Sequence, residues 1–228
     1  MFCTLRERSR ARGANPGEMD VGRIAGLWRY PTKSLKAEPL QCAAVLADGL
    51  EGDRTAALVV ESPTHARAGK PYRGKESAYL HLTSDPVTAA SYAADANVLV
   101  TLDRAQPRWF DARPVSVLLD LWVHDVEALV GEPLDPLRWR PNVYVTAVPG
   151  FAKREAGLVG SALRLGDVVL RVVDTIRRCV TPTYDVASGD ALPLVLEAVA
   201  TQRDNVVGVY CEVETPGGIA LGDTVRLG

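Results

Sequence analysis

The chain has 228 residues, of which 47% are hydrophobic and 24% are charged, and its formal net charge is -2. This length and composition predict an ordinary globular protein with one large domain or two small ones around a sizeable core. A charge so close to zero excludes a global positive field of the kind that recruits nucleic acid or an anionic membrane, so any anion site has to be local. No apolar run approaches the roughly 18 residues that a bilayer span needs.

The cysteines argue against a structural metal site. They stand at positions 3, 42, 179 and 211 without a Cys-x-x-Cys pair, and the three histidines lie far from them in the sequence. A zinc site or a disulfide framework is therefore not expected. Reduced cysteines in a cytoplasmic protein fit this pattern best.

Residues 1–20 carry four arginines among small and polar residues and have no apolar segment, so they do not resemble a secretory signal. We interpret them as a disordered extension or, because Met19 directly precedes the first strand pattern, as a mis-assigned start. An Arg-rich transit peptide is the alternative.

The first half of the chain predicts short strands separated by turn residues. β-branched and alternating apolar residues predict strands at 21–28, 40–46, 54–60, 79–83 and 98–102. Residues 63–76 form a polar loop rich in Gly, Pro, Lys and Arg. Asp85 and Pro86 predict the start of a short helix over residues 87–94.

The second half follows a connection at residues 107–114, where we place a domain boundary. It predicts two helices, at 121–130 and 193–201, and six strands, at 115–119, 143–148, 161–165, 168–173, 206–213 and 219–227. Strands do not alternate regularly with crossover helices, as a parallel sheet requires. We therefore expect a mainly β (α+β) fold built on an antiparallel β-barrel with a few short helices.

The strand at 168–173 leads to Cys179, which follows Arg177 and Arg178 directly. Cationic neighbours favour the thiolate, which is the nucleophilic form of cysteine and a soft metal ligand. The plainer interpretation is a small buried thiol at a strand end. Cys211 lies within a strand pattern and is expected in the core.

Polar residues at other strand ends are candidate anion binders. Lys33 and Ser34 follow a proline on a loop that we expect to be exposed, Arg54 begins a strand, and Arg140 and Asn142 flank a proline. Ammonium, guanidinium, hydroxyl and amide groups all hold phosphate oxygens without a metal. Each of these residues alone is equally consistent with an ordinary surface position.

Together these residues form a series of short motifs in a fixed order. The motifs are Tyr30-Pro31-Thr32-Lys33-Ser34, Gly52-Asp53-Arg54, Arg140-Pro141-Asn142, Arg178-Cys179 with Thr183-Tyr184-Asp185 and Ser188-Gly189, and the closing stretch from 205 to 223. In these motifs the chain resembles the MOSC-domain family, named after the C-terminal domain of molybdenum-cofactor sulfurase. It is most similar to members such as the mitochondrial amidoxime-reducing component and its bacterial relatives.

The resemblance implies a smaller MOSC N-terminal β-barrel-like domain at 21–106 and a MOSC domain at 107–228. It also implies a molybdenum cofactor, that is, molybdenum bound to molybdopterin, with Cys179 as metal ligand and catalytic residue. The positions implied at the pterin or its phosphate are Lys33, Ser34, Arg54, Arg140, Asn142 and Arg178. A polyanionic cofactor needs local cations and one soft thiolate, and these motifs supply both.

The activity implied by the resemblance is the reduction of N-hydroxylated small-molecule substrates. No flavin, haem or iron–sulfur motif is visible, so a separate redox protein is expected to donate electrons. A carrier of the cofactor or of its sulfur, and a member that has lost the metal, are the alternatives. A full sulfurase is not expected, because its pyridoxal-phosphate domain does not fit into 228 residues.

Three positions depart from the family pattern and motivate those alternatives. Ile176 stands where a second cysteine is often found, which weakens a persulfide relay. Arg177 adds positive charge near the thiol, and Asp120-Leu121 replaces a Thr/Ser pair ahead of the helix. Loss of that pair removes expected cofactor hydrogen bonds and introduces a carboxylate.

Overall fold

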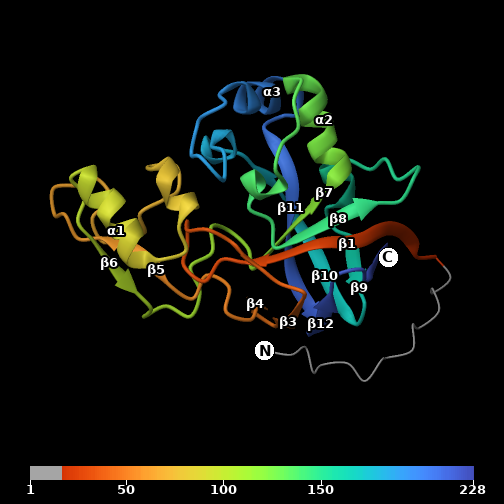
Figure 1. Ribbon diagram of the computed structural model, residues 1–228. Helices are drawn as coiled ribbons and strands as arrows, with labels where there is room; N and C mark the ends of the chain where they lie inside the picture. The colour runs from red at the N-terminus through yellow and green to blue at the C-terminus, as the bar shows by residue number, and fades with distance from the viewer. Residues whose placement is uncertain (1–16) are drawn as a thin grey trace.

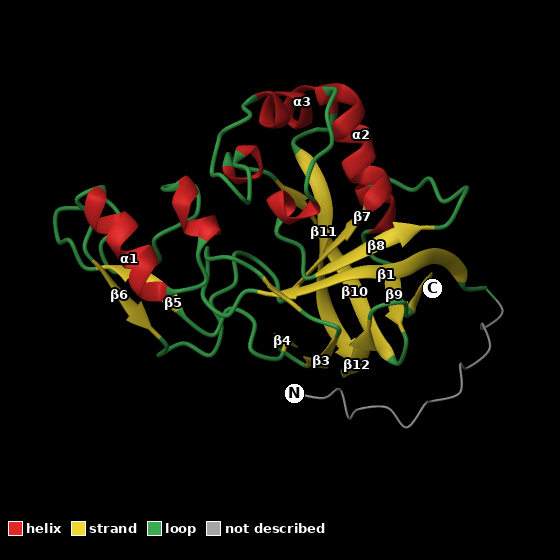
Figure 2. Cartoon of the chain, in the orientation of Figure 1, coloured by secondary structure: helices red, strands yellow, loops and turns green. Residues whose placement is uncertain are grey.

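The computed structural model describes residues 17–228 of the chain. Seven strands close into a barrel in the order β1, β13, β9, β10, β11, β7, β8 and back to β1 (Figures 1 and 2). The predicted barrel is therefore confirmed. Most of the expected N-terminal extension lies outside the described residues, but β1 already begins at Met19. The barrel strands are β1 (Met19–Arg29), β7 (Val115–Leu119), β8 (Val143–Ala147), β9 (Ala162–Leu165), β10 (Val168–Arg177), β11 (Val206–Thr215) and β13 (Thr224–Leu227).

One barrel pairing, between β7 and β8, is parallel, whereas the others are antiparallel. A parallel pair needs a crossover connection, which α2 (Asp120–Val130) supplies. The helix ends as predicted at Gly131, whose φ of 86° is typical of a C-cap. Asp120 is the first helical residue, and its Oδ1 accepts hydrogen bonds from the backbone of Leu121 and Ala147 at 2.7 and 3.0 Å. Its carboxylate thus binds the backbone at the start of α2 and in β8.

Further elements flank the barrel. A three-stranded sheet packs beside it, and α3 contacts α2 at the top of the molecule in Figure 1. These elements are β2 (Glu38–Pro39), which pairs with β1, the sheet strands β3 (Cys42–Leu46), β4 (Gly49–Leu50) and β12 (Gly217–Ala220), and α3 (Leu194–Gln202).

A smaller lobe with its own hydrophobic core lies to the left of the barrel in Figure 1. The predicted helix at 87–94 is confirmed there, but the predicted strand at 79–83 is wrong, because those residues form a 3₁₀ helix. The elements of the lobe are β5 (Ala57–Val60), β6 (Val100–Asp103), α1 (Pro86–Asp95) and the 3₁₀ helix η1 (Ala78–Leu82).

The strand pairing does not follow the expected domain boundary at 106/107. β1 precedes that boundary in the sequence but pairs with β8 and β13 in the barrel, and β3 pairs with β12. The smaller lobe retains one two-stranded sheet, β5 with β6, where the resemblance implied a barrel-like domain. The two halves of the sequence therefore share strands instead of forming two separate sheets.

The cysteines differ in state. Cys42 is disulfide-bonded, so the expectation of reduced cysteines is wrong at this position. Cys211 is free and fully buried, which confirms its expected place in the core. None of the helices formed by residues 17–228 has the length and apolar character needed to cross a membrane.

Gly208 in β11 lets three segments approach one another closely. Its φ is 89°, and a Cβ atom built on it would lie 3.0 Å from Nη2 of Arg178 and 3.2 Å from the carbonyl oxygen of Val117. Both the backbone conformation and the space favour glycine. A side chain here would press directly on Arg178, which precedes Cys179.

Gly208→Ala is expected to lower the free energy of unfolding by about 1–3 kcal/mol, because alanine is strained at a positive φ and its Cβ would crowd the guanidinium of Arg178. Urea titration would measure this as a lower midpoint at an unchanged m-value. Gly218→Ala is the matched control, because nothing lies within 4 Å of its added Cβ and its φ is not positive. Equal midpoints for the two variants would contradict the role given to Gly208.

His81 in η1 connects the smaller lobe to the barrel. It is 6% exposed, and Nη1 of Arg140 lies 3.1 Å from its Nδ1. Since a guanidinium only donates, Nδ1 accepts this hydrogen bond and the ring is neutral. Burial, followed by the charge of Arg140, lowers the pKa of His81 to about 3.

This burial predicts a loss of stability in mild acid. Below pH ~6.5 the unfolded chain protonates His81, whereas the folded chain does not until about pH 3. The free energy of unfolding should therefore fall by up to about 1.4 kcal/mol for each unit that the pH drops through this window. His81→Asn keeps a hydrogen-bond acceptor but does not titrate, so the slope of its unfolding free energy between pH ~6.5 and ~5 should be shallower.

Exposed His124 on α2 provides the control, and His124→Asn should keep the wild-type slope. Urea titrations at several pH values would compare the three proteins. If the free energy of unfolding falls equally with pH in the wild type and in His81→Asn, His81 is not the group that causes the loss of stability.

Candidate functional site

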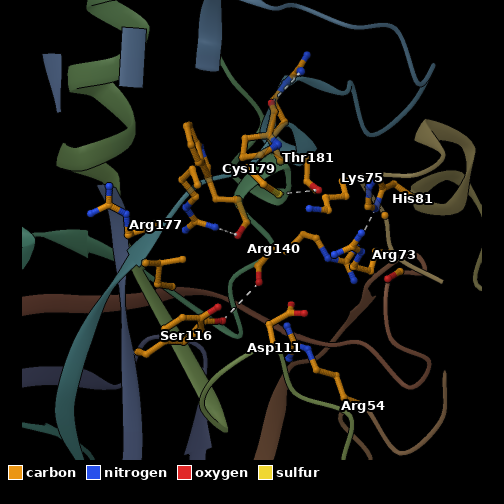
Figure 3. Close-up of a pocket in the computed structure, with 18 residues that line it drawn as sticks. Arg54, Arg73, Lys75, His81, Asp111, Ser116, Arg140, Arg177, Cys179 and Thr181 are labelled. Carbon is orange, nitrogen blue, oxygen red and sulfur yellow. Dashed lines mark hydrogen bonds between the residues drawn. The ribbon is translucent and has the colours of Figure 1, made fainter. Parts of the chain in front are cut away.

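A cavity of about 230 Å³ opens between the barrel and the smaller lobe (Figure 3). The barrel contributes Ser116 from β7, Tyr210 from β11, the end of β10, and the 3₁₀ helix η2 (Pro136–Trp139) with Arg140. The smaller lobe contributes the segment 73–75 and His81. Two parts of the fold therefore have to meet before the cavity exists.

Cys179 lies just after β10, where the chain leaves the barrel. Its thiol is free and exposed, and Sγ lies 3.3 Å from Oγ1 of Thr181. The backbone leaves the extended conformation directly after it, because Val180 is helical and the 3₁₀ helix η4 (Thr181–Thr183) follows. The thiol lines the cavity, so the plainer interpretation of a buried structural cysteine does not hold.

Arg178 supports the backbone before Cys179. Its Nε donates to the carbonyl oxygen of Val207 at 2.7 Å, its Nη1 donates to that of Trp139 at 2.8 Å, and Nη2 also donates to Val207. The guanidinium carbon lies 5.4 Å from the centre of the Trp139 ring. Burial lowers the pKa of Arg178 to about 10, so it stays charged at neutral pH. It joins β10, β11 and η2, and a direct contact with a pterin stays a prediction.

Arg54 and Arg140 form the cationic wall of the cavity. Their guanidinium carbons lie 4.8 and 4.2 Å from the centre of the same ring, that of Tyr30. Burial opposes the charge of Arg54, but Asp53, whose Oδ2 lies 2.5 Å from Nη1, outweighs burial and raises the pKa of Arg54. Both arginines have positive φ values, 48° and 54°, so the backbone turns sharply at each. Both arginines therefore line the same cavity, and their contact with a cofactor stays a prediction.

Asn142 lies behind this wall and does not line the cavity. It is 1% exposed, and its Oδ1 accepts hydrogen bonds from the backbone and hydroxyl of Ser116 at 3.1 and 3.0 Å and from Arg54 at 3.3 Å. Its Nδ2 donates to the carbonyl oxygen of Trp28. The amide thus positions Arg54 relative to β1 and β7, and the expected direct contact with a cofactor stays a prediction.

Lys33 and Ser34 were expected on an exposed loop, and this expectation is wrong, because they are 9% and 8% exposed. Nζ of Lys33 lies 2.6 Å from Asp111 and donates to the carbonyl oxygens of Trp109 and Phe110. Burial lowers the pKa of Lys33. Ser34 lines the cavity, whereas Lys33 reaches it only through Asp111.

Sequence reasoning missed several residues of the cavity. A polar loop was predicted at 63–76, but its Arg73 and Lys75 were not singled out, and His81 was assigned to a strand. Asp111 lies in a connection that carried no motif. The only available signal was the density of basic residues in the loop. The lining residues that were not singled out are Arg73, Gly74, Lys75, His81, Asp111, Ser116, Arg138, Trp139, Thr181, Pro182 and Tyr210.

The lining is strongly cationic, with seven Arg or Lys residues and one carboxylate, that of Asp111. Arg73 and Arg138 are paired with carboxylates that do not line the cavity. The side chain of Arg177 lies apart from the other labelled groups in Figure 3. A positive excess remains after these are set aside, so the cavity favours an anionic ligand.

Comparison with known structures agrees with the fold. The YuaD protein from Bacillus subtilis has a similar structure, with a TM-score of 0.52 and 18% identity, covering 92% of this chain and 96% of that chain. A hypothetical protein of known structure gives a TM-score of 0.50 and 12% identity, covering 93% of this chain and 70% of that chain. At these identities the likeness shows a shared fold. No curated protein matches the sequence.

The match to a family model shows to which protein family the chain belongs. The model of the MOSC domain matches residues 74–226, which include every strand of the barrel except β1 and the last residue of β13. MOSC domains are associated with molybdenum cofactor binding. The match covers more than half of the chain and ends within β13, so the chain belongs to the MOSC domain family.

Proposed function

We propose that this chain binds a molybdenum cofactor in the cavity and reduces N-hydroxylated small molecules with electrons from a separate redox protein. The observation that carries the proposal is the free thiol of Cys179 in a cavity walled by Arg54 and Arg140. A thiolate is a soft metal ligand, and guanidinium groups bind phosphate. Family membership supports the choice of cofactor.

The residues present fit such a group. Within residues 17–228 no three His, Cys, Asp or Glu side chains gather into a metal-binding cluster, so a metal at Cys179 takes one protein ligand and depends on the cofactor for others. The phosphate end of the cofactor fits beside Arg54, Arg140 and Ser34. When bound, the cofactor supplies the redox-active metal at which the N-hydroxylated group is reduced.

The chain's own residues hold the cofactor and orient it in the cavity. Cys179 binds the metal, and Arg178 keeps the backbone at Cys179 in place through its bonds to β11 and η2. Arg140 binds the anionic end, oriented by His81 and by the ring of Tyr30. Arg54 is 8% exposed, so its charge is only weakly screened by water, which strengthens its interaction with a ligand.

The alternative of a sulfur relay within the chain has less support. Ile176 lies where a second thiol would be needed, and the other free cysteine, Cys211, is fully buried. A relay needs two thiols that can meet. Within the part of the chain that the structure describes, Cys179 is the only exposed free thiol.

Protein made in a host that synthesises the cofactor should carry molybdenum and pterin near one equivalent each, and Cys179→Ala should reduce the molybdenum content roughly tenfold or more because the thiolate ligand is lost. Elemental analysis and fluorescence of the released pterin measure both. Cys211→Ala removes a thiol that cannot reach the cavity and should keep the wild-type content. Empty wild-type protein, or equal loading of Cys179→Ala, would rule out the thiolate site.

Loaded wild-type protein should reduce an amidoxime to the amidine when a redox partner supplies electrons, because the chain itself carries no other redox motif. The measurement is amidine formation across a panel of amidoximes, with unloaded protein as the control. Transfer of cofactor to an apo-enzyme without any reduction would instead identify a carrier.

A further inference from the structure

Asp111 is the one carboxylate that lines the cavity. It lies on the connection between β6 and β7, and Figure 3 shows it pointing into the cavity between Arg54 and Arg140. Its Oδ1 lies 2.6 Å from Nζ of Lys33. A negative group therefore already occupies the place where the cations converge.

The two partners of this ion pair differ in exposure. The side chain of Lys33 is 10% exposed, whereas that of Asp111 is 65% exposed. Burying an ammonium without an anionic partner is costly, and its other bonds are to two neutral carbonyl oxygens. Lys33 therefore needs an anionic partner, while Asp111 is exposed enough for another anion to replace it.

Arg54 has a different, permanent counter-ion. Asp53 is fully buried, pairs with Arg54, and also accepts a hydrogen bond from the backbone nitrogen of Tyr30 at 2.7 Å. Asp53 thus cannot leave without breaking the fold at β1. The three cations Lys33, Arg54 and Arg140 face two carboxylates, and only Asp111 is free to move.

We propose that Asp111 is the internal counter-ion of the anion site, and that a bound phosphate group takes its place on Lys33. With Asp111 in place, three cations and two carboxylates leave a local charge of +1. With Asp111 turned out, the same site carries +2, which matches a phosphate monoester dianion. Asp111 therefore sets the affinity of the site and disfavours weakly charged ligands.

The state of Asp111 is consistent with this role. Partial loss of hydration between the cavity walls opposes its ionisation, but the charges of Lys33, Arg54 and Arg140 outweigh this and hold the pKa of Asp111 below its usual range. The carboxylate is thus charged at neutral pH, where it competes with a ligand anion for Lys33. The occupant named here, the phosphate of the cofactor, rests on the proposed function.

Isothermal titration with inorganic phosphate at low ionic strength tests the proposal on cofactor-free protein. Asp111→Asn keeps the shape of the side chain but removes its charge, so phosphate should bind roughly tenfold more tightly than to the wild type. Asp48→Asn is the matched control, because Asp48 pairs with Arg108 and does not line the cavity. It should bind phosphate as the wild type does.

The gain in phosphate affinity caused by Asp111→Asn should depend on Lys33. Lys33→Met should weaken phosphate binding, and adding Asp111→Asn to it should recover less than about a third of the gain seen with Lys33 present. Thermal unfolding with and without phosphate checks that each variant is folded and gives a second measure of binding. Unchanged or weaker binding by folded Asp111→Asn, or a full gain without Lys33, would overturn the proposal.

Neither measurement needs molybdenum or a redox partner, so a negative result leaves the proposed oxidoreductase function open. Conversely, if the protein binds phosphate as expected but never takes up cofactor, the counter-ion role of Asp111 would stand and the proposed function would be wrong. Cofactor-loaded protein should bind no inorganic phosphate, because its own phosphate fills the site. Retained binding there would overturn the assignment of this site to the cofactor.

Discussion

The site depends on keeping like charges close together in the cavity between the barrel and the smaller lobe. Arg54 and Arg140 share one aromatic ring, that of Tyr30, at 4.8 and 4.2 Å. Such an arrangement is stable only if each charge is compensated by an anion, a dipole or a π face. Asp53 compensates Arg54, and the Tyr30 ring together with neutral His81 supports Arg140. The positive charge that these groups do not compensate creates the electrostatic potential that attracts an anionic ligand.

This arrangement also couples the two parts of the molecule. The arginines belong to loops at the barrel, whereas His81 and the basic segment 73–75 belong to the smaller lobe. A ligand that contacts both parts stabilises their contact, and any loosening of the lobe weakens the cationic wall. The lobe therefore contributes to binding through its position as well as through its own side chains.

The fold could be predicted from the sequence in large part, because alternation and turn residues are local signals. They failed at residues 79–83, where Leu80 and His81 are neighbours and are both buried, as a 3₁₀ helix permits and a one-faced strand does not. The motifs grouped Cys179 with Arg54 and Arg140, and the three residues do line one cavity. They did not show that Asn142 lies behind the wall or that Asp111 reaches into it, because side-chain direction and contacts between distant segments are tertiary properties.

The closure of the barrel has a consequence for how the chain folds. The first described strand, β1, pairs with the last strand, β13, and Met19 lies opposite Leu227. Contacts so distant in sequence form slowly, because a long loop has to be closed before they contribute. Until β13 is synthesised, β1 and β9 each keep an unpaired edge that can pair with another chain. The nascent protein is thus prone to aggregate until β13 has paired with both of these strands.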